Sequence, residues 1–118
     1  DIKVQNIHLD ISQVVPLGLF LNEAITNALK YAFSDTKKPL IVIELFSLPS
    51  GNIKLGIRDN GKGLPSKDDL GKPTSLGFTL METMAEQLDG EFKIESCDGL
   101  QLTIVFNPRE NSEHEHLE

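Results

Sequence analysis

The chain has 118 residues, of which 39% are hydrophobic and 25% charged, a composition ordinary for one globular domain with its own core. Its 18 acidic residues outnumber the 11 basic ones, and the formal net charge of −7 disfavours binding to nucleic acid or to an anionic membrane surface. Cys97 is the sequence's single cysteine, which excludes an internal disulfide and a zinc site built on thiolates.

No apolar run approaches the roughly 20 residues that a membrane span needs. With the lone cysteine, this favours a reducing, cytoplasmic setting. Because the sequence starts at Asp1 without methionine, we expect a fragment of a longer parent, which is either soluble or membrane-anchored.

The first predicted elements are a strand and a long helix. Ile7, Leu9 and Ile11 alternate with polar residues, which predicts a half-buried strand. A helix is predicted from Pro16 to Phe33, because proline suits the first turn of a helix. Its apolar stripe would be formed by Leu17, Leu21, Ala24, Ala28 and Ala32.

The other side of this helix carries an unusual combination of side chains. Glu23, Asn27 and Lys30 fall within an arc of roughly 60°, flanked by Thr26 and Tyr31. Asparagine is a poor residue for a helix interior, so Asn27 indicates either a ligand that it holds or a structural amide satisfied within the protein.

Two hairpins and a second helix follow. Residues 40–48 and 53–58 predict antiparallel strands joined by the turn at 49–52. The polar segment up to Ser75 is either a lid or a floppy insertion. A helix is predicted from Gly77 to Leu88, and a second hairpin from the alternation at 92–95 and 102–106.

These elements predict an α+β fold: a two-layer α/β sandwich with a mixed, mostly antiparallel sheet and the helices on one face. The domain would occupy residues 1–108. We expect residues 109–118 to form a disordered acidic tail, whose final Leu117-Glu118 pair is consistent with a cloning remnant.

Several residues could together bind a nucleotide. The Walker phosphate loop is absent, and Gly61-x-Gly63 lacks the third glycine of a dinucleotide fingerprint. Asp59, however, ends a strand and could accept a hydrogen bond from the amino group of adenine. Ser75-Leu76-Gly77 opens a helix, whose free amides would suit phosphate.

Three segments resemble motifs of one family. Residues 22–33 (NEAITNALKYAF) resemble the N box of sensor histidine kinases, and residues 59–63 (DNGKG) their first glycine box. Residues 75–80 (SLGFTL), running on to 87–90, resemble the second glycine box. The resemblance spans residues 7–107 and implies the Bergerat ATP-binding fold, shared with gyrase, Hsp90 and MutL ATPases.

The resemblance also implies roles for individual residues. Asn27 would bind Mg²⁺, Asp59 would receive the adenine amino group, and Glu23 matches the general-base carboxylate of the wider superfamily. Leu100 departs from the threonine usual at its position. The implied nucleotide-binding residues are Asn27, Lys30 (to phosphate), Tyr31 (beside the base), Asp59, Gly61, Gly63, Leu64, Ser75, Leu76 and Gly77.

The resulting hypothesis is the ATP-binding catalytic domain of a histidine kinase. It would transfer the γ-phosphoryl group of Mg·ATP to a histidine on a dimerisation domain absent from this chain, and from there the group would pass to a response-regulator receiver domain. Two alternatives stay open: an anti-sigma-type serine kinase or ATP-gated switch of the same fold, and a degenerate module that binds only a partner helix.

Overall fold

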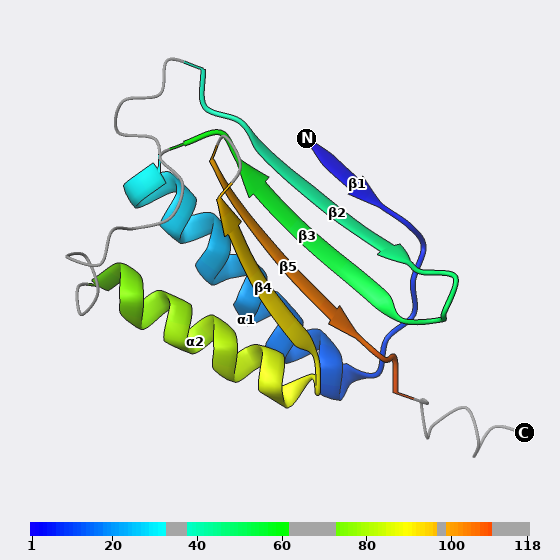
Figure 1. The fold of residues 1–118 in the computed structure, drawn as a ribbon. Helices are drawn as coiled ribbons and strands as arrows, with labels where there is room; N and C mark the ends of the chain where they lie inside the picture. The colour runs from blue at the N-terminus through cyan, green and yellow to red at the C-terminus, as the bar shows by residue number, and fades with distance from the viewer. Residues whose placement is uncertain (33–37, 62–72, 97–98, 110–118) are drawn as a thin grey trace, which may run out of the picture.

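The computed structural model describes residues 1–32, 38–61, 73–96 and 99–109. In this part of the chain a five-stranded sheet of order β1-β2-β3-β5-β4 is covered on one face by two helices that lie side by side (Figure 1). The elements are β1 (Ile2–Val4), α1 (Ile11–Asn27), the π-helical turn η1 (Ala28–Ala32), β2 (Ile41–Ser47), β3 (Ile53–Asp59), α2 (Pro73–Gln87), β4 (Glu91–Ser96) and β5 (Leu100–Phe106).

The sheet confirms the predicted fold class and both hairpins. β2 pairs antiparallel with β3, and β4 pairs antiparallel with β5. β3 also pairs antiparallel with β5, and only β1 runs parallel to its neighbour β2 among the described strands. The two hairpins are thus joined side by side into one mixed, mostly antiparallel sheet.

The strand predicted at residues 7–11 is wrong. The first strand is Ile2–Val4, and α1 begins at Ile11 because Asp10 caps it. The Asp10 carboxylate accepts hydrogen bonds from the amide of Ser12, at 3.1 Å, and from the Ser12 hydroxyl. Ile7 and Leu9 pack, half-buried, against the core from an extended segment.

The predicted long helix exists but is shifted toward the N-terminus. α1 starts five residues before Pro16, which is buried inside the helix rather than in its first turn. The predicted stripe is buried at Leu17, Ala24 and Ala28, and the prediction missed Phe20, which is fully buried. Phe20 meets Phe92 of β4 edge to face, with ring centroids 5.3 Å apart.

α2 also begins earlier than predicted, at Pro73 instead of Gly77. It packs beside α1 over the sheet, and Met81, Ala85 and Leu88 are buried there. Neither helix in the described part of the chain is long and apolar enough to cross a membrane.

A buried glutamine ties the end of the domain to α1. Gln13 is completely buried, and its amide donates to the carbonyl of Asn107 and accepts from the amide of Arg109. Arg109, which we expected in the tail, donates to the Gln87 carbonyl at the end of α2. Residues 110–118, the rest of the expected tail, lie outside the described residues.

Candidate functional site

The polar face of α1 meets the start of α2 at Gly77. A Cβ atom added at Gly77 would lie 2.5 Å from Oε1 of Glu23 and 2.7 Å from Nδ2 of Asn27. Both distances are far below normal contact, so a glycine is required for the two helices to approach with these side chains between them. Gly77 and Asn27, which are 50 positions apart and belong to two different motifs, therefore lie next to each other.

Asn27 is the most unusual polar side chain of this site. It is only 8% exposed, and its Nδ2 has no hydrogen-bond partner among the described residues. An unsatisfied buried amide is rare and indicates a missing partner. Since the two ends of an amide are assigned rather than observed, either the nitrogen or the oxygen of Asn27 is left for a ligand.

The side chains of Asn27 and Glu23 fit a magnesium ion. Mg²⁺ prefers oxygen ligands and usually takes only one or two from the protein, the others coming from water and phosphate. The half-buried Glu23 carboxylate and the Asn27 amide, drawn together against Gly77, are such oxygen donors.

The π-helical turn carries the next two predicted residues. Lys30 is exposed, so its ammonium group is accessible to an anion. Tyr31 lies in η1, but its side chain is outside the description. Because a π turn departs from 3.6 residues per turn, the spacing that placed Lys30 beside Asn27 does not hold strictly beyond Asn27.

Asp59 is held rigidly at the end of β3. It is 7% exposed, and its Oδ1 accepts from the amides of Gly61, at 2.9 Å, and Leu100, at 3.1 Å. Within the described residues Oδ2 has no partner, so it can accept a hydrogen bond from a ligand. Leu100, which departs from the family pattern in its side chain, contributes here through its backbone.

A glycine that the site prediction missed keeps Asp59 in place. Gly99 has a φ of +133°, and a Cβ there would overlap the carbonyl oxygen of Asp59. The turn between β4 and β5 therefore reaches the end of β3 only because position 99 has no side chain.

Asn60 fixes the strand that flanks this end of the sheet. Its side-chain oxygen accepts from the amide of Leu40, at 2.9 Å, and its side-chain nitrogen donates to the carbonyl of Lys38, at 2.8 Å. In the structure, Asn60 connects the chain entering β2 to the end of β3.

The early start of α2 changes the expected phosphate site. The first four amides of a helix lack partners inside it, so the free amides of α2 belong to Thr74, Ser75 and Leu76, since Pro73 has none. Gly77 comes after this first turn. Its contribution is the close approach to Glu23 and Asn27.

The parts of the candidate site gather at one end of the molecule. Figure 1 shows the arrowhead of β3, the η1 end of α1 and the first turn of α2 at the same upper-left end. Gly61, which donates to Asp59, is half-buried there. Gly63 and Leu64 belong to residues 62–72, which lie outside the description.

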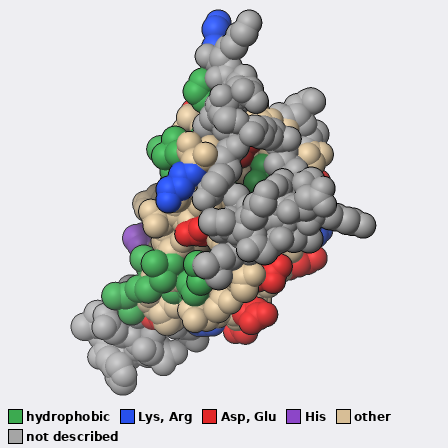
Figure 2. Space-filling view, turned by 90° about the vertical axis from the view of Figure 1, so that its left-hand side faces the viewer, with side chains coloured by type: hydrophobic (Ala, Val, Ile, Leu, Met, Phe, Trp, Pro, Cys, Tyr) green, Lys and Arg blue, Asp and Glu red, His purple; other side chains and the backbone are tan. Residues whose placement is uncertain are grey.

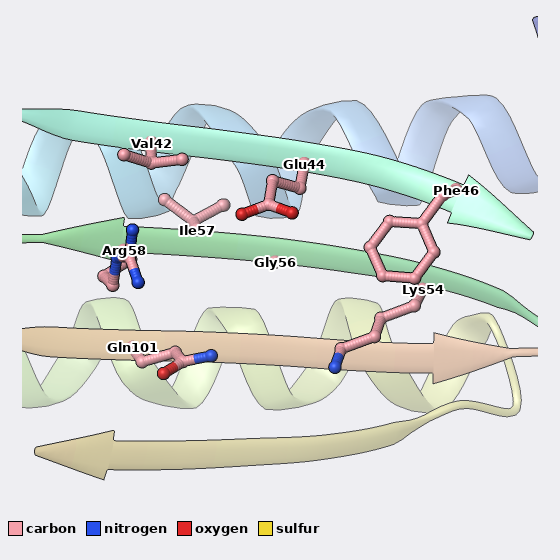
Figure 3. A pocket seen from close by; sticks show the side chains of 8 residues that line it. All are labelled: Val42, Glu44, Phe46, Lys54, Gly56, Ile57, Arg58 and Gln101. Carbon is pink, nitrogen blue, oxygen red and sulfur yellow. The ribbon is translucent and has the colours of Figure 1, made fainter. Parts of the chain in front are cut away.

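A hollow on the open face of the sheet is a rival location, and it is too small. Figure 3 shows Glu44, Lys54, Arg58 and Gln101 around Gly56, on the face turned away from the helices. The hollow has a volume of about 70 Å³, whereas pockets for small-molecule ligands span about 300–1,000 Å³.

Comparisons with known proteins point to one family. Residues 13–111 match the family described as histidine kinase-, DNA gyrase B-, and HSP90-like ATPase. The histidine kinase domain of a blue-light-activated kinase of Erythrobacter litoralis has a similar structure, with a TM-score of 0.81 and 20% identity; the match covers 98% of this chain and 52% of that one.

Three curated proteins are similar in sequence. The nitrate/nitrite sensor protein NarQ of Escherichia coli is 30% identical over 96% of this chain and 19% of its own length. Blue-light-activated histidine kinase 2 of E. litoralis is 21% identical over 80% of this chain and 27% of its own. Anti-sigma F factor of Priestia megaterium is 23% identical over 64% and 58%. The chain thus spans 19% of the length of NarQ and 27% of the length of blue-light-activated histidine kinase 2.

Proposed function

This chain belongs to the family of histidine kinase-, DNA gyrase B- and HSP90-like ATPases, and from that premise we propose that it is the catalytic domain of a sensor histidine kinase. It would bind Mg·ATP and transfer the γ-phosphoryl group to a histidine on a dimerisation domain outside this chain. A response-regulator receiver domain would then accept the group. The domain would work in the cytoplasm, without touching nucleic acid or membrane.

One observation carries the proposal: the buried Asn27 amide, without a partner among the described residues, is pressed with Glu23 against Gly77. Such an arrangement leaves a polar group for a ligand at the junction of two helices. Asp59, held by two amides at the same end of the fold, offers Oδ2, which has no partner among the described residues, as an acceptor.

In this proposal each residue has a binding or orienting role. Asp59 Oδ2 would accept from the adenine amino group, and the amides of Ser75 and Leu76 would donate to phosphate. Lys30 would neutralise phosphate charge, and Tyr31 would lie beside the base. Gly61, Gly63 and Leu64 would contact the nucleotide through the backbone of the loop after β3, where glycines allow close approach.

Phosphoryl transfer then depends on positioning and charge neutralisation. Asn27 would hold Mg²⁺, which would supply charge neutralisation at the phosphates. The acceptor imidazole nitrogen attacks the γ-phosphorus, and the bond to the bridging oxygen breaks to release ADP. Glu23 would orient this site or accept the imidazole proton.

Nucleotide titration of the 118-residue chain tests the binding site. Asp59→Asn keeps an acceptor for the two amides but presents an amide instead of a carboxylate, and we expect Mg·ATP affinity to fall by more than about tenfold. Glu86→Gln, at an exposed position of α2, is the control and should bind normally. Equal affinity of Asp59→Asn and wild type would contradict the assignment.

A thermal-shift measurement separates a nucleotide-binding domain from a degenerate one. Mg·ATP at 100 times its dissociation constant should stabilise the folded chain by about 2.7 kcal/mol. No stabilisation at millimolar Mg·ATP would favour the degenerate module that binds only a partner.

The similarity to anti-sigma F factor favours a second candidate, a serine kinase or ATP-gated switch of the same fold. The chemistry of the product distinguishes the two. Phosphohistidine is lost in acid and phosphoserine is not, so labelling with radioactive ATP followed by acid treatment decides which acceptor the parent protein uses.

A further inference from the structure

The end of β3 is bound to the chain that enters β2 by one asparagine. Asn60 Oδ1 accepts from the amide of Leu40, at 2.9 Å, and Asn60 Nδ2 donates to the carbonyl of Lys38, at 2.8 Å. The backbone amide of Asn60 also donates to the carbonyl of Leu40, at 3.3 Å. We call these three hydrogen bonds the Asn60 bridge.

The Asn60 bridge requires an asparagine. One end of the side chain accepts and the other donates, and asparagine is the shortest side chain that does this with two separate atoms. An aspartate would keep the acceptor but lose the donor, and an alanine would lose both. Because both ends of the side chain are turned toward residues 38–40, Asn60 is left to act on a nucleotide through its neighbours.

Asp59 depends on such support because it lies where the sheet ends. Its pairing with Ile41 is the last of the β2–β3 ladder, and the β3–β5 ladder ends one residue earlier, with Arg58 and Gln101. The ends of strands open more readily than their centres. The Asn60 bridge continues the contact beyond the ladder on the β2 side, and it therefore opposes opening of the backbone at Asp59.

The Asn60 bridge lies at the end of the molecule that carries the candidate site. Figure 1 shows the start of β2 beside the arrowhead of β3 at the upper end. Figure 2 is turned about the vertical axis, so this end stays at the top, whereas the acidic side chains on the face that it shows gather at the lower right. A nucleotide is an anion, so it is repelled least where carboxylates are few. The bridge thus stands apart from this acidic surface.

We propose that Asn60 is a positioning residue for recognition of the base. Through the Asn60 bridge it holds the Asp59 carboxylate where Oδ2 meets the amino group of adenine, so this inference rests on the proposed function. Two amides orient Oδ1 of Asp59, and the bridge fixes the backbone from which that side chain extends. A shift of about 1 Å can lower the contribution of a positioned group by up to about a hundredfold.

A comparison of two nucleotides tests this role. Purine riboside triphosphate is ATP without the 6-amino group, so the ratio of its dissociation constant to that of ATP reports on the amino contact. With Mg²⁺ present, the wild-type chain should prefer ATP by about tenfold or more. In Asn60→Ala the affinity for ATP should fall by about tenfold, while the affinity for the analogue stays within about twofold, so that the preference is lost.

Two further variants separate positioning from general damage to the site. Asn60→Asp keeps the size of the side chain and the acceptor for Leu40 but faces the Lys38 carbonyl with an oxygen. Its extra charge weakens both nucleotides alike, so a lower ratio again shows lost positioning, and this variant carries the comparison if Asn60→Ala does not fold. Asn52→Ala, between β2 and β3 at the opposite end of the hairpin, should keep the wild-type ratio.

Amide hydrogen exchange tests the Asn60 bridge without a nucleotide. In Asn60→Ala the Leu40 amide should exchange faster, because its acceptor is gone. The Leu100 amide should also exchange faster, because it is bonded to the Asp59 carboxylate, which would no longer be held. Unchanged exchange at Leu40, or faster exchange at Leu40 alone, would overturn the proposal.

The outcomes distinguish failure of this inference from failure of the proposed function. If the wild-type chain does not bind Mg·ATP at millimolar concentration, the proposed function is wrong. If wild type prefers ATP and Asn60→Ala keeps the same ratio, whether both affinities fall equally or neither falls, the role of Asn60 alone is wrong. Loss of the preference in Asn52→Ala as well would also overturn that role.

Discussion

Replacing Gly77 by alanine perturbs the candidate site through one methyl group. The added Cβ would lie 2.5 Å from Oε1 of Glu23 and 2.7 Å from Nδ2 of Asn27. The Glu23 carboxylate is the end of a flexible side chain and can swing away. Asn27 is short and only 8% exposed, so the clash must be relieved mainly by moving its amide or by separating the helices.

Two opposing effects set the change in stability. Alanine is favoured over glycine inside a helix by about 1 kcal/mol, and overpacking a close contact typically costs about 1–3 kcal/mol. We therefore expect the free energy of unfolding to fall by between 0 and about 2 kcal/mol. The fold survives, so ligand binding can be measured.

Binding of Mg·ATP should weaken as well. To reach an ordinary contact of 3.4 Å from 2.7 Å, Nδ2 of Asn27 would have to retreat by 0.7 Å, the difference of the two distances. A misplacement of this order can lower the efficiency of a positioned group by up to about a hundredfold. We expect Mg·ATP to bind about tenfold or more weakly, a loss of about 1.4 kcal/mol.

Isothermal titration calorimetry with Mg·ATP measures this change, and Gly18→Ala is the matched control. Gly18 is also inside a helix, but a Cβ there would meet no atom within 4 Å, so alanine should stabilise the chain by about 0.5–1 kcal/mol and leave binding unchanged. If Gly77→Ala binds Mg·ATP as tightly as wild type, the contact between Gly77 and the polar face of α1 has no part in nucleotide binding.

Three further predictions concern stability. Gln13→Leu leaves two backbone groups of the segment after β5 without their buried partner, so urea unfolding should show a loss of about 2–4 kcal/mol; no loss would mean that water replaces both bonds. Gly99→Ala should abolish cooperative unfolding or lower the free energy of unfolding by more than about 3 kcal/mol, since its Cβ would overlap the backbone of Asp59. Gly51→Ala is the control: Gly51 has a φ of +94°, but a Cβ there would meet no atom within 4 Å, so the free energy of unfolding should fall by only about 1–2 kcal/mol. The Ser12 hydroxyl and amide, which donate to the Asp10 carboxylate, lower the pKa of this group. A lowered folded-state pKa stabilises the folded protein at pH values above the ordinary pKa near 3.8, and this stabilisation is lost as the pH falls through the folded-state pKa. Asp10→Asn should therefore flatten this part of the acid unfolding curve, and an unchanged curve would contradict the role of Asp10 as the cap.

The sequence predicts the fold correctly where the pattern of apolar residues is local. The alternation around Ile57 and Ile104 gave each hairpin, and each pairs as expected. The sequence does not predict β1, because a strand of three residues is too short to show a period. This strand depends on its backbone pairing with β2 around Ile43, which is distant in sequence. The start of α1 has a local signal, because Asp10 is followed three residues later by Gln13, whereas the prediction from Pro16 begins the helix five residues too late.

The candidate site was less readable from residue patterns alone. The three-motif resemblance predicted its family, and the family match confirms that prediction. No spacing predicts that Gly77 contacts Asn27, or that Gly99 touches Asp59, because both contacts join distant parts of the chain. The roles of all the predicted site residues, Asn27 and Asp59 among them, stay predictions.

In the proposed function, one nucleotide binds where α1, β3 and α2 meet. Titration of the ¹⁵N-labelled chain with Mg·ATP, followed by NMR, tests this residue by residue. The largest shifts should occur at the backbone amides of Gly61, Gly77 and Leu100 and at the side-chain amide of Asn27. Shifts concentrated around Gly56 on the open face of the sheet, or no shifts at millimolar Mg·ATP, would contradict it.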